Sequence, residues 1–498
     1  MQQDKILNIE EAFERAKDYK KSLEDIGELI NSEEEIKNIS SNALSLWNLM
    51  EPSMATYIYP QIYSKTQKFN LKSKLKIFIS YFFSKETLSR KKDLRTADIR
   101  DNTVLFICFE KRQIEGAREM ISEIQQYGKK AILITSSVMN LDSLDYFDGV
   151  VTIESFFTKL QRKNIHKEEK LYTKKAKYIF RSIDKCENKM KGRLTSFLSS
   201  NLRIHYYLSR YLKYLVLAEE VLKEFSSPII FSFDETDPRI RAFFIQAKKN
   251  GLTSIYSQFG LQTKRDIELS YSIASDICFF GKSYFDLGRA MGLESNFHAT
   301  GCLRYDQLNS VSKKEIAYIN QLYPQSLGKK LILFASQPDF GDSFFLVGNK
   351  NKLIKELVKS VKKDNLFLIV RPHPDEDIRK LLENFSGLNE ENHAVCKTAN
   401  FSTLMKSTDV LVTFFSTCIL ESIILDKKII LLGEHKNEFY DFYSKEAGAL
   451  QCSSSDEINR ALFQDENNNM RSEFMDNHLL NFDGLSYQRM AKIVVQDV

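Results

Sequence analysis

Three groups of polar residues follow apolar runs, and each group carries side chains that can bind or activate a phosphate or a sugar. The first group is Arg371, His373 and Pro374, directly after the run LFLIV (366–370). Pro374 can open a helix, and free N–H groups at a helix start attract phosphate. Arg371 and His373 would add charge-assisted donors. The pattern predicts a phosphate-binding site, with a hydrogen-bonded support as the alternative role for His373.

The second group is Ser416 and Thr417, after the run DVLVTF (409–414). Either hydroxyl can cap the helix that follows, and capping is compatible with binding a nucleotide. Glu421 lies one turn further on and could hold ribose hydroxyls. We also predict nucleotide contacts for Ser336 and Gln337, at the end of the run LILFAS (331–336).

The third group is acidic: Asp234, Glu235 and Asp237 follow the run PIIFSF (228–233). Clustered carboxylates are costly at a strand end unless they are solvated, paired or used. One of them could be a general base or a carboxylate nucleophile, with Asp234 the first choice and Glu235 the second. The alternative is acidic capping of a helix that has Pro238 at an early position.

A weaker signal follows the run TSIY (253–256). Gly260 permits a tight turn and close approach of a ligand. Lys264 and Arg265 come next and could meet an acidic sugar. We therefore predict Gln258, Gly260, Lys264 and Arg265, together with Asp237, as contacts of the donor sugar or the acceptor.

The elements that must position these groups alternate between apolar strand-like runs and segments with helical spacing. Two series of this kind predict an α/β protein of the GT-B type, with two Rossmann-like doubly wound domains facing a cleft. Ligands bind such sheets at the carboxyl ends of the strands. The expected domains are a helical region 1–100, an acceptor lobe 101–302 with a basic helical insertion at about 155–225, a nucleotide-sugar lobe 303–475, and a helix 476–498 that crosses back to the first lobe.

The charge distribution and the cysteine pattern limit which partners and cofactors we expect. The net charge of the 498 residues is only +5, but Thr158–Arg193 carries thirteen Lys and Arg against four acids. This run is either a solvated helical face or a basic surface for anionic lipid or a polyanionic glycan, and we expect no nucleic acid. The seven cysteines form no C-x-x-C pair, so we expect reduced thiols, and with no D-x-D motif we expect neither a metal nor another cofactor.

The amino terminus is polar, and no apolar stretch approaches the ~20 residues that span a bilayer. We expect a cytoplasmic protein and leave open a peripheral contact with the inner face of the plasma membrane.

The combination FSFDETD…SIYSQFG…RPHP…FFSTCILES, within about 225–435, resembles bacterial transferases that use CMP-activated ulosonic acids. These include the polysialyltransferases and, as the closest group, the capsule and O-antigen β-Kdo transferases. The resemblance implies that Arg371, His373 and Pro374 contact the CMP phosphate and that Ser416 and Thr417 lie at the same nucleotide.

For Asp234 the resemblance implies attack on the anomeric carbon in a retaining enzyme, or a base in an inverting one. Two positions depart from the related patterns. Thr236 stands where polysialyltransferases have Gly, and Phe259 stands where related surface-polymer transferases have His in Q-H-G.

The expected function is transfer of Kdo from CMP-Kdo to a glycan or glycolipid acceptor in surface polysaccharide synthesis. The donor carboxylate would need a cation, for which Lys264, Arg265 and Arg304 are candidates. One alternative is a CDP-polyol phosphotransferase of teichoic-acid type, which should have catalytic histidines in both lobes. The first lobe offers His166, His205 and His298, none beside the acidic cluster. Further alternatives are a non-hydrolysing UDP-sugar epimerase and a non-catalytic scaffold of an assembly complex.

Overall fold

The computed structural model describes the chain from residue 101 onward with gaps. The described residues are 101–114, 116–136, 144–156, 163–167, 201–260, 267–306, 313–337, 350–363, 365–373, 376–397, 399–414, 416–433, 446–464, 469–480 and 482–496, with a few isolated residues elsewhere. Nearly all of the expected helical region 1–100 and most of the expected basic insertion therefore lie outside the described residues. So do Pro374, Lys264 and Arg265.

The chain divides into two compact units. The first comprises residues up to Thr300 together with Tyr487–Val498, and the second is Gly301–Ser486. Gly301 has a φ of 80°, in the left-handed region that glycine adopts without strain. The chain thus passes from the first unit to the second at a residue suited to a sharp turn.

The first unit is built on a parallel sheet of seven strands in the order β3-β2-β1-β4-β5-β6-β7. The order reverses between β1 and β4, which is the switch point where doubly wound sheets open a crevice. The strands are β1 (Thr103–Ile107), β2 (Lys130–Thr135), β3 (Gly149–Thr152), β4 (Ile229–Ser232), β5 (Ser254–Ser257), β6 (Asp276–Phe279) and β7 (Asn296–Ala299).

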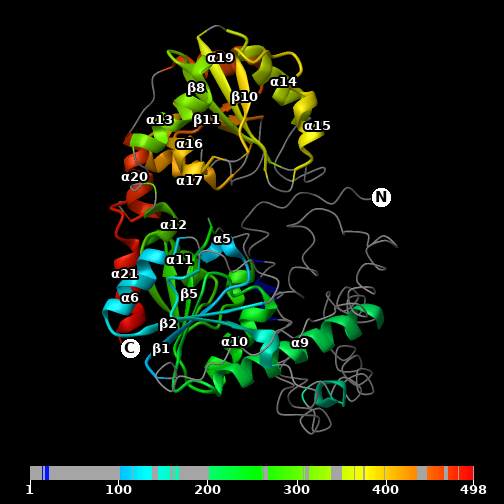
Figure 1. Ribbon diagram of the computed structural model, residues 1–498, viewed down its shortest axis with the longest axis vertical. Coiled ribbons are helices and arrows are strands. Elements are labelled where there is room, and N and C mark those ends of the chain that lie inside the picture. Colours follow the sequence, from blue (N-terminus) through cyan, green and yellow to red (C-terminus); the bar gives the residue numbers. More distant parts are fainter. Residues whose placement is uncertain are drawn as a thin grey trace. The chain divides into compact units, whose positions relative to one another are not determined.

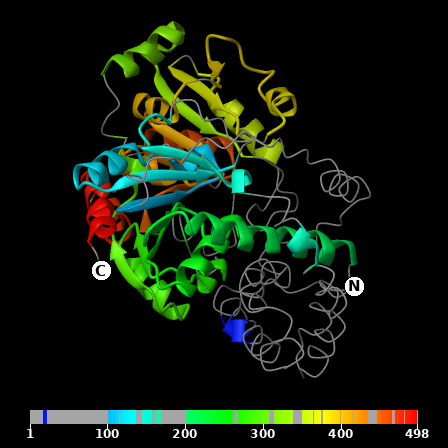
Figure 2. The ribbon, with the colours of Figure 1, turned by 60° about the horizontal axis from the view of Figure 1, so that its bottom comes forward.

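Helices cover both faces of this sheet. The long helix α9 packs along α10, while α6 and the carboxyl-terminal α21 lie on the other side (Figures 1 and 2). The helices are α5 (Lys111–Ile114), α6 (Arg118–Gln126), η2 (Ile153–Phe156), α9 (Asn201–Leu222), α10 (Pro238–Lys249), η3 (Ile267–Tyr271), α11 (Ser283–Ala290) and α21 (Ser486–Val495). On α21, Arg489 Nε donates to the carbonyl of Thr300 at 2.9 Å, which fixes this helix to the first unit.

The second unit contains a parallel sheet of six strands in the order β10-β9-β8-β11-β12-β13, with its switch point between β8 and β11. The strands are β8 (Lys330–Ala335), β9 (Leu366–Arg371), β10 (His393–Val395), β11 (Val410–Thr413), β12 (Lys428–Leu432) and β13 (Leu450–Cys452). The helices are α12 (Leu303–Asp306), α13 (Lys313–Leu322), η5 (Pro324–Ser326), α14 (Lys350–Ser360), α15 (Ile378–Glu383), α16 (Phe401–Ser407), α17 (Cys418–Ile424), α19 (Ser455–Phe463) and α20 (Asn469–His478).

The core of the second unit explains why its strands are almost continuously apolar. Alternate residues of β8, β9 and β11 face a cluster that includes apolar side chains of α14, α15 and α19. On the other side of the sheet α16 packs against α13 and α17. Because both faces are covered, both sets of strand side chains are buried. Two such sheets confirm the expected fold class of two Rossmann-like doubly wound domains.

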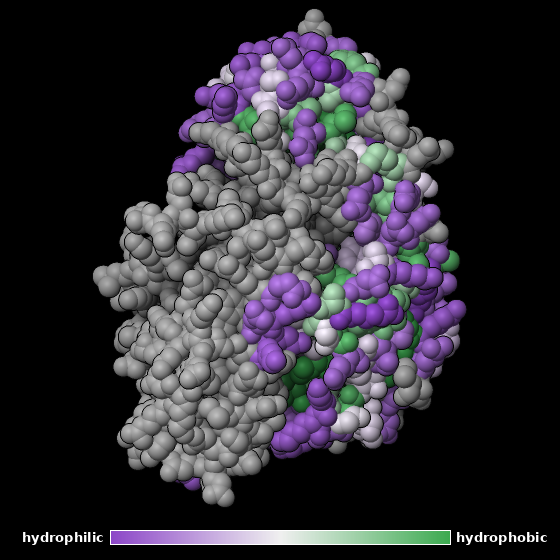
Figure 3. Space-filling view, turned by 180° about the vertical axis from the view of Figure 1, so that it is seen from behind, coloured by the Kyte–Doolittle hydropathy of each residue, from purple (hydrophilic) through white to green (hydrophobic). Residues whose placement is uncertain are grey.

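The surface of the described residues is ordinary for a globular protein. On the face shown in Figure 3, hydrophilic side chains surround smaller apolar areas. Within the part of the chain that the structure describes, no helix combines the length and apolarity needed to cross a membrane.

Removing a buried side chain from the second sheet tests this packing. Leu368 lies in the middle of β9 and is completely buried. Leu368→Ala should lower the free energy of unfolding by about 2–5 kcal/mol, because it removes apolar contacts and leaves a cavity. Leu327→Ala is the control, since Leu327 is 64% exposed. Urea unfolding measures both, and equal small effects would contradict the assigned core.

Candidate functional site

At the carboxyl edge of the second sheet, Arg371 and His373 come directly from β9. Arg371 is the last residue of the strand, and its Nη1 donates to the carbonyl of Cys396 at 3.1 Å. The main-chain N–H of Ser336 donates to the carbonyl of Arg371 at 2.9 Å, which joins the ends of β8 and β9. Arg371 is half-buried at this edge. Its guanidinium is therefore positioned where ligands of open parallel sheets bind.

The helix after this segment does not begin where the sequence suggested. Pro374 was expected to open it, but α15 begins at Ile378 with Asp377 as its N-cap. The Asp377 carboxylate accepts from the main-chain N–H of Arg379 at 3.1 Å. Asp is among the preferred N-cap residues because its carboxylate accepts from the first main-chain N–H groups of the helix. The main-chain N–H groups of Arg379 and Lys380 at the start of α15 are thus already bonded to Asp377. The expected helix start at Pro374 is corrected, and phosphate binding at Pro374 stays a prediction.

An ion pair that sequence reasoning missed fastens this edge. Glu376 accepts from Ser336 Oγ at 2.9 Å and pairs with the ammonium of Lys350. Its second oxygen accepts from the main-chain N–H of His373 at 3.3 Å. Lys350, the first residue of α14, also donates to the carbonyl of Gln337. The loops after β8 and β9 are therefore tied together, and Ser336 and Gln337, predicted as nucleotide contacts, take part in this support.

The predicted pair Ser416 and Thr417 lies at the start of α17, next to the switch point of the sheet. Ser416 Oγ accepts from the main-chain N–H of Cys418 at 3.4 Å. Thr417 is the N-cap residue, but its side chain makes no capping bond and is exposed. The two roles considered for these hydroxyls were helix capping and nucleotide binding. The Ser416 hydroxyl makes one long capping bond, and the Thr417 hydroxyl makes none.

Glu421 lies in α17 and is only 7% exposed. One oxygen of its carboxylate lies 3.5 Å from Nη2 of Arg304 on α12. Burial raises the pKa of Glu421, and the nearby Arg304 guanidinium partly offsets this effect. Arg304, a candidate cation for a donor carboxylate, thus already faces an acid of its own unit.

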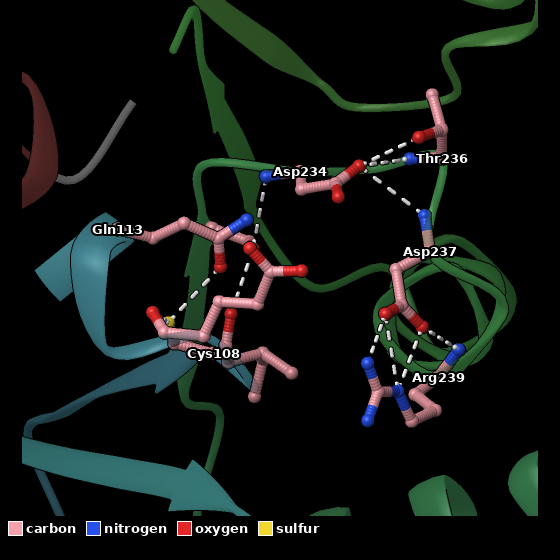
Figure 4. Close-up of polar contacts among 9 residues, drawn as sticks. Cys108, Gln113, Asp234, Thr236, Asp237 and Arg239 are labelled. Atoms are coloured by element: carbon pink, nitrogen blue, oxygen red, sulfur yellow. Dashed lines mark hydrogen bonds and ion pairs between the residues drawn. The ribbon is translucent and has the colours of Figure 1, made fainter. Parts of the chain in front are cut away.

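In the first unit, Asp234 follows β4 at the switch point, and Figure 4 shows its surroundings. Oδ1 accepts from Thr236 N at 2.9 Å, from Thr236 Oγ1 at 2.7 Å and from Asp237 N at 3.2 Å. Oδ2 makes no hydrogen bond to the described residues. Burial raises the pKa of Asp234, the Thr236 hydroxyl lowers it and the charge of Asp237 raises it. Such a carboxylate is held by one oxygen and can accept a proton at the other.

Glu235 faces the interior instead. It is only 3% exposed, and Arg241 Nη1 lies 3.1 Å from its Oε1. The main-chain N–H of Ile273 donates to the same oxygen at 2.7 Å, and Ser272 Oγ donates to Oε2. A carboxylate with this many internal donors is engaged in supporting the fold, so we retain Asp234 alone as the candidate reacting group.

Asp237 has the capping role weighed as the alternative. Its Oδ1 accepts from the main-chain N–H of Arg239 at 2.8 Å at the start of α10, and its carboxylate also binds the Arg239 guanidinium (Figure 4). That guanidinium stacks on the Phe109 ring, 4.3 Å from the ring centroid. Cys108 lies nearby, and burial raises the pKa of its thiol to about 12, so it stays protonated near neutral pH.

Gln258 and Gly260 form a fixed turn after β5. Gln258 is buried, its Oε1 accepts from Phe280 N at 2.8 Å, and its Nε2 donates to the Gly260 carbonyl at 2.9 Å. The side chain of Gln258 is thus committed to the turn. His298 does not join this edge: its Nε2 lies 2.8 Å from Asp276, the first residue of β6 and hence at the opposite edge.

The chain is similar to one protein family over its second unit and to several solved structures over most of its length. Residues 280–496 match the family model described as CDP-Glycerol:Poly(glycerophosphate) glycerophosphotransferase. No protein of curated function matches the chain. Among solved structures, the UDP-bound MnaA of S. aureus is 13% identical, over 78% of this chain and 94% of that one, with a TM-score of 0.50.

Two further solved structures are UDP-N-acetylglucosamine 2-epimerases. The one from Neisseria meningitidis, bound to UDP-GlcNAc, is 12% identical, over 79% of this chain and 100% of that one, with a TM-score of 0.51. The other is 14% identical, over 80% of this chain and 95% of that one, also with a TM-score of 0.51. At these identities the likeness shows the GT-B-like fold.

The buried ion pair between Arg241 and Glu235 allows a test of whether Glu235 stabilises the fold. Arg241→Met should lower the free energy of unfolding by about 3–5 kcal/mol, because Glu235 would keep a buried charge without its cation. Arg289→Met is the control, since the Arg289–Asp286 pair is exposed and should contribute under about 1 kcal/mol. Chemical denaturation measures both, and an unchanged Arg241→Met protein would refute the supporting role.

Proposed function

We propose that this protein is a phosphotransferase that moves a polyol phosphate, with glycerol phosphate as the first candidate, from a CDP-activated donor to a growing polymer. The observation that carries the proposal is the match of residues 280–496 to the CDP-glycerol glycerophosphotransferase family model. This stretch contains all of the second unit. The match favours the CDP-polyol alternative of the sequence analysis over CMP-Kdo transfer.

The proposed reaction is a displacement at phosphorus. An acceptor hydroxyl oxygen bonds to the phosphorus that carries the polyol, the pyrophosphate P–O bond breaks, and CMP leaves with the electron pair of that bond. The developing charge on CMP needs fixed donors, and Arg371 and His373 at the end of β9 are our candidates. The Lys350–Glu376 pair holds the loop that carries His373.

The hydroxyl proton needs a base, and we assign it to Asp234. Its Oδ1 is held by three donors while its Oδ2 is free of bonds to described residues, and its pKa is raised by burial. A raised pKa makes a carboxylate a better proton acceptor near neutral pH. In this chain Asp234 would take the role of general base. A phosphotransferase of this type was expected to have a catalytic histidine in the first lobe.

CMP-Kdo transfer remains a second candidate function, because the sequence has no histidine within the acidic cluster 234–237 or in the segment Ser257–Gly260. Phe259 occupies the position of His in the Q-H-G pattern, and its ring lies 6.4 Å from the Phe233 ring. An acidic group without a neighbouring histidine is the arrangement expected for CMP-Kdo transfer. There Asp234 would act on an acceptor hydroxyl or on the anomeric carbon.

The proposed partners are a CDP-activated donor and a polymer acceptor. We propose that the enzyme works on the cytoplasmic side of the membrane. The basic run Thr158–Arg193 is our candidate for contact with an anionic surface or a polyanionic polymer. Neither the donor nor the acceptor calls for a nucleic acid.

Turnover with a panel of donors tests the proposal. CDP-glycerol with a poly(glycerophosphate) acceptor should release CMP, whereas CMP-Kdo, CMP-sialic acid and UDP-GlcNAc should not react. His373→Ala should slow the release by about 100- to 1,000-fold, because a fixed donor to the leaving group is lost. His393→Ala is the matched control: His393 begins β10, and its side-chain Nδ1 lies 2.8 Å from the nearby Asn389 carbonyl oxygen.

The panel has two contrary outcomes. Release of CMP from CMP-Kdo alone would establish the second candidate. No turnover with any donor, in protein that is folded and supplied with acceptor, would favour the scaffold alternative.

The pH dependence tests the base. Because burial raises the pKa of Asp234, kcat/KM should fall on the acid side at a pH above the range of an ordinary aspartate. Below that pH Asp234 is protonated and cannot accept the hydroxyl proton. Asp234→Asn should abolish most activity, and the exposed Asp286→Asn should change nothing. An unchanged acid limb in a still active Asp234→Asn enzyme would exclude this assignment.

A further inference from the structure

The carboxylate of Glu421 is buried, and only one of its two oxygens has a partner among the described residues. Its Oε1 lies 3.5 Å from Arg304 Nη2, while its Oε2 is buried and has no hydrogen-bond partner among the described residues. An acceptor oxygen withdrawn from water without a donor is costly. A protein that keeps such an oxygen at the edge of a sheet has an acceptor available for a ligand that brings a donor.

The position of Glu421 limits what that ligand can be. Helix α17 follows β11 next to the switch point between β8 and β11, where open sheets bind nucleotides. A carboxylate oxygen accepts hydrogen bonds and repels anions, so it cannot serve the phosphates. The nucleoside part of a CDP donor offers two kinds of donor, the ribose hydroxyls and the cytosine amino group.

Arg304 lies close to only one oxygen of Glu421, Oε1, so the other oxygen, Oε2, is the one that could accept a hydrogen bond from a ligand. Arg304 lies on the short helix α12, and its Nη2 also donates to the Tyr305 hydroxyl at 2.9 Å. Tyr305 is buried, so this bond holds the guanidinium in place. The cation faces Oε1, and Oε2 is left without a donor among the described residues. It also favours the ionised form of an acid whose burial disfavours it.

We propose that Arg304 is a positioning residue for nucleotide recognition: it holds the Glu421 carboxylate so that Oε2 accepts a hydrogen bond from the ribose hydroxyls of the donor. The inference rests on the proposed function, since it takes a cytidine nucleotide as the ligand. Arg304 itself does not touch the nucleotide in this arrangement. It acts by orienting Glu421 and keeping it charged.

Calorimetric titration of the full chain with CMP and with 2′,3′-dideoxy-CMP tests the inference. The wild-type protein should bind CMP about 10- to 100-fold more tightly, as expected for a hydrogen bond to a charged acceptor. Arg304→Gln should reduce this ratio to near one by weakening CMP alone. Arg304→Lys should recover part of the ratio, because it restores the charge without the planar guanidinium.

A matched control is available in the same unit. Arg471 is also buried and pairs with Asp426, just beyond the other end of α17, at 3.0 Å. Arg471→Gln removes a comparable buried cation but should leave the ratio of CMP to 2′,3′-dideoxy-CMP affinity unchanged. An equal fall in both variants would mean that the effect of Arg304 is a general loss of stability, and the inference would be rejected.

The remaining outcomes separate this inference from the proposed function. If the protein binds no cytidine nucleotide, both fail. If it binds CMP but the wild-type ratio is near one, only the role of Arg304 and Glu421 fails. A preference for CMP over UMP that disappears in Arg304→Gln would assign Oε2 to the cytosine amino group and reject the ribose. If Arg304→Gln does not fold, the wild-type ratio and Glu421→Gln, which should lower it, decide the question.

Discussion

The burial of both faces of each parallel sheet is the constraint on which the rest of the structure depends. With helices on both sides, the strands of the second unit accept almost nothing but apolar side chains, as β8 and β9 show. Polar groups are then confined to the strand ends. The two switch points, between β1 and β4 and between β8 and β11, fix which loops can gather them. Asp234 lies at the first of these and Glu421 follows the second.

Within those edges, the carboxylates differ in how completely their burial is compensated. Glu235 and Glu376 each have a cation and hydrogen-bond donors, so they stabilise the loops from which they come. Asp234 and Glu421 each keep one oxygen without a donor among the described residues. Burial raises the pKa of both, which is the usual cost of a charge withdrawn from water. The two acids that we propose for reaction and for binding thus differ from the supporting acids in having one carboxylate oxygen without a donor among the described residues.

Much of the fold could be predicted from the sequence because apolar runs and helical spacing are local signals. The loop 371–378 shows where local signals fail: Pro374 suggested a helix start, yet Asp377 caps a helix that begins at Ile378. The partners of the buried acids were not predictable, because Lys350 meets Glu376 only through the folding of two loops onto one edge. The clustering of acids after β4 was visible in the sequence. Which of them faces inward depends on the position of Arg241 in α10.

The central claim is that the group transferred carries a phosphate. Phosphorus NMR of the folded full chain with CDP-glycerol and a poly(glycerophosphate) acceptor tests it most directly. The account predicts that the pyrophosphate signals disappear while a CMP monoester signal and an equal new phosphodiester signal grow. An unchanged CDP-glycerol spectrum, together with CMP formed from CMP-Kdo and no new phosphodiester, would contradict it.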